Sequence, residues 1–148
     1  MSRLFPSQKS HATWNAVNLL SQADAVEADA TTVCYFMVEH ISDEKVIQEL
    51  ATRLIKSGCR EFHFWGKHEA KWHFEFDATY IQLNPDFDEN TVAITFGCPA
   101  WKDLVEDVVL PMIVSNFVPT RFVLFYDDEE RYQSLCRDCE AYTQDEDV

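Results

Sequence analysis

The chain has 148 residues, 47% of them hydrophobic and 14% aromatic, and its 12 basic and 26 acidic residues give a net charge of −14. This length and apolar content suit one domain with an ordinary core and argue against global disorder. Nucleic acids and anionic membranes bind proteins mainly through Lys and Arg, so we expect this chain to bind neither of them directly.

The N-terminal segment, residues 1–30, is expected to precede the main domain. It carries apolar residues at helical spacing around Trp14, Val17 and Leu20, and a polar stretch containing Ala and Asp follows them. This pattern predicts one helix and a linker before an α/β domain over residues 31–143. Because no long apolar run occurs, neither a secretory leader nor a membrane span is expected.

Four segments of the main domain have strand composition, namely 31–38, 61–66, 91–97 and 121–127. Each is rich in β-branched or aromatic residues. The first, third and fourth are almost continuously apolar, which is typical of parallel strands covered on both faces. Helical patterns separate the four segments. The sequence therefore predicts a single three-layer α/β/α domain with a mainly parallel four-stranded sheet, flavodoxin-like in outline.

The first predicted helix of this domain covers residues 43–57, where apolar side chains recur at i, i+3 and i+4. Ser42 or Asp43 can cap its start, and Gly58 stands where a glycine commonly ends a helix. A second helical pattern covers 100–116, and Pro111 should kink it or end it early.

The last helix should begin near Asp127 and Asp128 and lead into an acidic tail, residues 144–148. Its apolar stripe consists of Tyr132, Leu135, Cys136, Cys139 and Tyr142.

Residues 70–80 fit two structures. Alternate residues are apolar, which is a strand pattern, yet Trp72, Phe76 and Tyr80 also share one helical face. Parallel strands that are adjacent in sequence need a crossover between them, and a helix supplies it. We therefore predict a helix, with an antiparallel hairpin to 61–66 as the alternative.

Polar residues follow each predicted strand and would meet at the carboxyl edge of a parallel sheet, where ligands bind in such folds. Imidazole, thiol and carboxylate groups there could serve a cysteine nucleophile with a histidine base, or bind zinc. This alternative reading is a cysteine- or metal-dependent enzyme, or a small-ligand regulatory domain, using Cys98, His40, His68 and Asp127. Those residues share the predicted edge with Glu39, Lys67 and Asp128.

The five cysteines suggest no disulfide pattern, so reduced thiols in a cytoplasmic protein are expected. If Pro99 opens the helix after the third strand, Cys98 is its N-cap, a position that lowers the pKa of a thiol. Cys98 would then react before Cys136 and Cys139, which should face the core. The chain contains neither a Walker loop nor a GxGxxG turn, and we predict no cofactor and no metal.

The acid is concentrated at the C-terminal end, where residues 127–148 contain nine Asp or Glu and two Arg. Such a segment either keeps a chain soluble or docks on a basic surface. The leading prediction is a non-catalytic protein-binding module, an adaptor, inhibitor or immunity-type partner of a protein with a basic surface. The predicted partner-binding residues are Asp128, Glu129, Asp145, Glu146 and Asp147.

Overall fold

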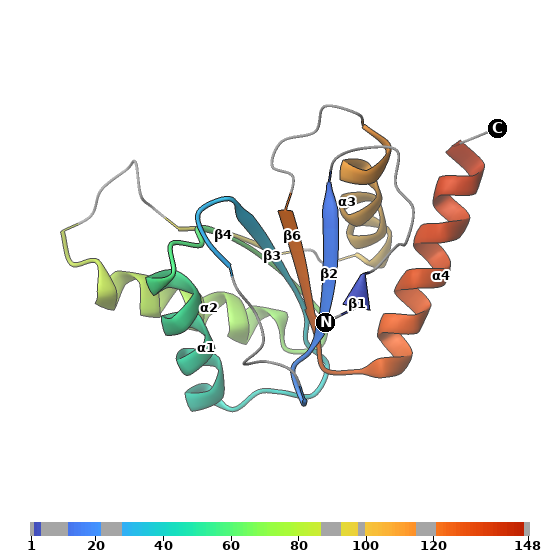
Figure 1. Ribbon diagram of the computed structural model, residues 1–148. Coiled ribbons are helices and arrows are strands. Elements are labelled where there is room, and N and C mark those ends of the chain that lie inside the picture. Colours follow the sequence, from blue (N-terminus) through green and yellow to red (C-terminus); the bar gives the residue numbers. More distant parts are fainter. Residues whose placement is uncertain are drawn as a thin grey trace.

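A six-stranded sheet lies between two pairs of helices in the computed structural model (Figure 1). The structure describes residues 2–3, 12–21, 28–86, 93–97, 100–114 and 121–146, with only the backbone described for 2–3 and 144–146. The predicted three-layer α/β/α domain is confirmed.

The sheet has the strand order β1-β2-β6-β3-β4-β5. The five strands from β2 to β5 in this order are parallel to one another, and β1 is antiparallel to β2. All four predicted strands are present, and the sheet contains one further parallel strand. The strands are β1 (Ser2–Arg3), β2 (Thr13–Asn18), β3 (Thr32–Met37), β4 (Glu61–Trp65), β5 (Ile94–Gly97) and β6 (Arg121–Tyr126).

The prediction of a helix around Trp14, Val17 and Leu20 is wrong, because this segment forms strand β2. It pairs along its whole length with β6, and the ring of Trp14 stacks on that of Phe122 with centroids 4.6 Å apart. Trp14 and Val17 are both buried, on opposite faces of the sheet, and Leu20 is exposed in the turn that follows. A strand covered on both faces resembles a helix in its apolar spacing, since its buried residues need not alternate.

The predicted helix over 43–57 is α1 (Glu44–Lys56), and its capping signals act as expected. The Asp43 carboxylate accepts hydrogen bonds from the backbone N–H groups of Lys45 and Val46. At the other end Gly58 has φ +100°, and its N–H donates to Ile55 O at 3.1 Å. The next N–H, of Cys59, donates to Leu54 O at 3.1 Å, which completes a Schellman motif.

The ambiguous segment forms helix α2 (Glu69–Leu83), so the hairpin alternative is excluded. Helix α3 (Trp101–Ile113) ends soon after Pro111, in line with the early end expected there. Helix α4 (Glu129–Glu146) extends through residues 144–146, which were expected to begin the acidic tail.

Two apolar cores occupy the two faces of the sheet. One packs α1 and α2 against residues such as Phe36, Phe62 and Phe125. The other packs α3 and α4 against Trp14, Tyr35 and neighbouring strand residues. In the part of the chain that the structure describes, none of the helices combines the length and apolar character needed to cross a membrane.

Candidate functional site at the carboxyl edge of the sheet

The connection order of the strands singles out one place on the carboxyl edge. From β3 the chain proceeds outward to β4 and β5, then crosses back to β6 on the other side of β3. The helices after β3 and β6 therefore cover opposite faces of the sheet (Figure 1). Ligands of open α/β sheets bind where the connections diverge in this way. The 39–41 loop and Asp127 meet at this switch point.

Asp127 is bound there by the backbone of the 39–41 loop. Its Oδ1 accepts the N–H of Glu39 at 2.8 Å, and its Oδ2 accepts those of His40 at 3.0 Å and Ile41 at 2.8 Å. The Asp127 residue is 2% exposed. Converging backbone N–H groups are a common anion-binding device, and here the anion they hold is a carboxylate of the same chain.

The 39–41 loop is also held by helix α2, on the α1–α2 side of the sheet. The indole N–H of Trp72, from α2, donates to Ile41 O at 2.8 Å. The same loop is thus tied to β6 through Asp127 and to α2 through Trp72. Both ties are part-buried, and together they attach the loop to two different elements of the fold.

His40 and Asp128 form an exposed pair beside this buried cluster. Nε2–H of His40 donates to Asp128 Oδ2 at 2.8 Å, and 62% of the histidine side chain is exposed. Asp128 Oδ1 also accepts the backbone N–H of Arg131 at 3.0 Å, so Asp128 caps the start of α4. The bond from Arg131, followed by that from His40, holds the pKa of Asp128 below its usual value.

Two tryptophans and an arginine, which we call the Trp–Arg cluster, lie on the α3–α4 side of the same edge. Trp65 ends β4 and Trp101 begins α3, and their rings meet at 65° with centroids 4.9 Å apart. The Arg131 guanidinium lies 5.8 Å from one ring centroid and 5.9 Å from the other, within cation–π range. Arg131 Nε is also 4.0 Å from Glu39 Oε1.

The other sequence-predicted edge residues do not join this arrangement. His68 precedes the first turn of α2 and makes no side-chain capping bond to the described residues, while its backbone N–H donates to Val38 O at 3.1 Å. Cys98 lies outside the described residues. Helix α3 has Ala100 as its N-cap, so the argument for a pKa-lowered Cys98 at that position no longer applies.

No group of three or more His, Cys, Asp or Glu among the described side chains is placed to hold an ion. His73, for example, lies 2.7 Å from the hydroxyl of Thr95 and 3.4 Å from the Asp77 carboxylate, in a pairing of α2 with β5.

The buried thiols of α4 match the sequence prediction. Cys139 is fully buried and Cys136 partly buried against the same core, and burial raises the pKa of both.

In native protein we expect maleimide to label Cys136 at least roughly tenfold faster than Cys34, Cys59 or Cys139, because the other three require local opening. Mass spectrometry of peptides over a time course measures these rates. Equal rates for Cys136 and Cys139 would contradict the packing of α4.

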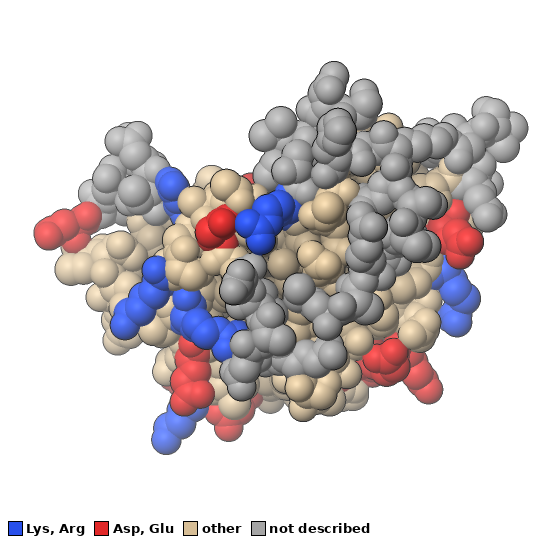
Figure 2. All heavy atoms as spheres, viewed as in Figure 1, with Lys and Arg blue, Asp and Glu red and all other residues tan. Residues whose placement is uncertain are grey.

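The charged surface is less uniform than the net charge suggests. Along α4, at the right of Figure 2, acidic and basic side chains alternate, and several basic side chains gather over α1 at the left. Of the predicted partner-binding residues, Asp128 and Glu129 lie at the start of α4, and Asp145 and Glu146 lie in its last turn. Asp147 lies outside the described residues.

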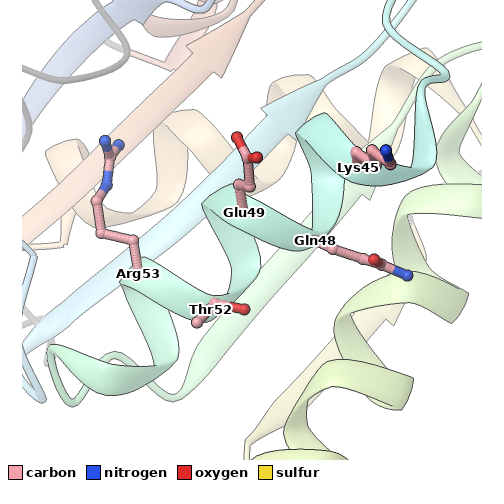
Figure 3. Close-up of a pocket in the computed structure, with 5 residues that line it drawn as sticks. All are labelled: Lys45, Gln48, Glu49, Thr52 and Arg53. Carbon is pink, nitrogen blue, oxygen red and sulfur yellow. The ribbon is translucent and has the colours of Figure 1, made fainter.

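A pocket of about 450 Å³ on the α1 surface is a separate candidate site. Its lining residues are polar or charged, with Glu49 and Arg53 extending from one side of α1 (Figure 3). Gln48 extends towards α2, where its amide donates to the buried Glu75 carboxylate at 2.8 Å. All five lining residues come from α1, so the hollow is a feature of one helix surface and is separate from the carboxyl edge.

Sequence reasoning does not single out Trp101 or Arg131, although both lie at the candidate site. The available signal was positional: Trp65 ends a predicted strand, and Trp101 follows one at the start of a helix. Tryptophan is enriched among the residues that dominate binding energy, so this pair is the signal in the sequence that could have pointed to this edge.

The profile of one protein family, described as Domain of unknown function (DUF7684), matches residues 14–96. The match runs from β2 into β5, so it spans more than half of the chain and includes the 39–41 loop but not Asp127. No curated protein and no solved structure matches the chain. The chain thus belongs to the family Domain of unknown function (DUF7684).

Proposed function

We propose that this domain is a non-catalytic protein-binding module that presents its carboxyl edge and α4 to a basic surface of another protein. The observation that carries the proposal is the occupied switch point. Three backbone N–H groups that could hold an anionic ligand are bound to the Asp127 carboxylate. These three N–H groups are therefore not available to an anionic ligand, which favours a protein-binding surface over a small-ligand or catalytic site at this place.

The Trp–Arg cluster supports the same proposal. Trp and Arg are the residue types that most often dominate protein–protein binding energy. Arg131 is half exposed and lies against two tryptophan rings, so its orientation is largely set before a partner arrives. Preorganised side chains lose less conformational entropy on binding, which favours affinity.

The acidic residues near the C-terminal end favour a partner with a basic surface. Long-range attraction mainly speeds association and is screened over about 10 Å at 0.1 M salt. The partner would be captured from the cells that produce this protein, identified by mass spectrometry, and purified for kinetic measurements. We expect the association rate to fall roughly tenfold or more from about 50 to about 500 mM salt, with a smaller change in dissociation.

Two matched double variants test which acidic residues speed association with the partner. Glu129→Gln with Glu146→Gln removes two charges from α4, and Glu44→Gln with Glu49→Gln removes two from α1. The first should slow association roughly three- to tenfold and the second less than twofold. An association rate indifferent to salt and to both pairs would reject the electrostatic part of the proposal.

The enzyme alternative predicts a different pattern. Cys98→Ala or His40→Ala would then abolish cellular function while the fold and partner binding stay intact. That result would replace the binding proposal with a catalytic one.

A further inference from the structure

Two cysteines from different elements face each other in the core on the α1–α2 side of the sheet. Cys34 is in the middle of β3, and Cys59 lies in the turn between α1 and β4. Their Sγ atoms are 3.4 Å apart, across 25 positions of sequence, and the two residues are 0% and 1% exposed. A disulfide has an S–S length of about 2.05 Å, so the two sulfurs need to approach by only about 1.4 Å.

The backbone fixes both cysteines in this arrangement. Cys34 belongs to a strand that is paired on both sides, with β4 and with β6. Cys59 is held by the Schellman motif, in which Gly58 adopts a positive φ and the Cys59 N–H donates to Leu54 O. Two well-defined local structures therefore set the backbone positions from which the two thiols meet.

The two thiols are chemically unequal. A hydrogen bond from the Cys34 thiol lowers the pKa of Cys59, and the backbone N–H groups of Glu61 and Arg60 act in the same direction. The same thiol contact, followed by burial, raises the pKa of Cys34. A thiolate attacks a disulfide where a thiol does not, so Cys59 is the first nucleophile of the pair.

We propose that Cys34 and Cys59 form a site of reversible oxidation, at which a low-molecular-weight disulfide such as glutathione disulfide converts the two thiols into an intramolecular disulfide. The Cys59 thiolate attacks one sulfur of glutathione disulfide, forming a mixed disulfide and releasing a glutathione thiolate that takes up the Cys59 proton. Cys34, deprotonated, then attacks Cys59 Sγ, and the second glutathione leaves with the Cys34 proton. The two thiols lose two electrons, and glutathione disulfide is reduced to two glutathione molecules.

Access to Cys59 is through its own turn. Its neighbours Ser57 and Arg60 are exposed, so opening of this short turn uncovers the sulfur without unpairing β3. Oxidation should consequently be slow. Its equilibrium position depends on the ratio of glutathione to glutathione disulfide and on how well the folded chain accommodates the bond.

The test uses a variant that keeps only this pair, Cys98→Ala/Cys136→Ala/Cys139→Ala. It is equilibrated with mixtures of reduced glutathione and glutathione disulfide, once folded and once in concentrated urea. Each sample is quenched with acid and alkylated, and mass spectrometry measures the fraction of protein in the disulfide form. We expect the effective concentration of the two thiols to be roughly 30- to 700-fold higher in the folded state. The disulfide form should melt roughly 5 to 10 °C higher than the dithiol form.

A folded-to-unfolded ratio of one or less would overturn the proposal, because the fold would then resist the bond. Adding Cys34→Ala to this variant should leave only a mixed disulfide at Cys59. Peptide mapping of the oxidised wild-type chain needs no substitution and should find the 34–59 bond. Any other intramolecular pairing, or a dimer linked through these residues, would also overturn it.

Discussion

Replacing Asp127 with alanine is expected to lower the free energy of unfolding by about 3 to 5 kcal/mol. The substitution removes a carboxylate that accepts three backbone N–H groups, and it leaves those donors unsatisfied in a part-buried loop. Hydrogen bonds to a charged group are among the stronger ones in proteins. Urea denaturation followed by circular dichroism measures the loss.

Asp127→Asn should lower the free energy of unfolding by about half as much as Asp127→Ala does. An asparagine with its oxygen at the position of Oδ2 keeps the bonds from His40 and Ile41, but its NH₂ group then faces the Glu39 N–H. Glu130→Gln, at an exposed position of α4, is the control and should stay within about 0.5 kcal/mol. If Asp127→Ala also stayed within that range, the structural role of the carboxylate would be refuted.

Gly66→Ala should lower the free energy of unfolding by about 3 to 5 kcal/mol. Gly66 lies at the carboxyl edge, where the ends of β3 and β4 meet. Gly66 has φ +121°, and a Cβ there would lie 2.6 Å from Val38 O. That oxygen accepts the N–H of His68, and Val38 N–H donates to Trp65 O at 2.8 Å. The methyl group therefore forces apart the ends of β3 and β4, which thermal and urea unfolding both detect.

Gly58→Ala separates backbone strain from collision. Gly58 also has a positive φ, of +100°, but the nearest atom to an added Cβ is Ala30 N at an ordinary 3.6 Å. Only the conformational strain remains, so a cost of about 1 to 2 kcal/mol is expected. Equal losses for the two variants would show that the contact with Val38 contributes nothing.

Local signals in the sequence were sufficient for most of the elements. Asp43 and Gly58 delimit α1 because an N-cap carboxylate and a C-terminal glycine act within one turn of the helix. The 70–80 segment shows where a local pattern fails, since its alternation favoured a strand. A rule of topology, the crossover between parallel strands, correctly predicted α2 instead.

Strand β2 illustrates what local patterns cannot supply. Six residues with Trp14 and Val17 at helical spacing form a strand because β6, over 100 positions away, offers a paired edge and two apolar faces. Neither the partner nor the strand order is encoded in the six residues themselves. Pairing energy in a sheet comes from neighbours, so the same short segment can be helical or extended in different contexts.

The candidate site likewise depends partly on local sequence and partly on tertiary structure. The sequence by itself determined that His40, Asp127 and Asp128 follow buried strands, and hence that they share one edge of a parallel sheet. Only the tertiary structure decided that β3 and β6 are neighbours, which brings Asp127 onto the backbone N–H groups of the 39–41 loop. It also decided that Cys59 meets Cys34 and that Arg131 meets two tryptophans. Residue type and periodicity are local properties, whereas hydrogen bonds and contacts across 25 to 88 positions depend on the order in which strands pack.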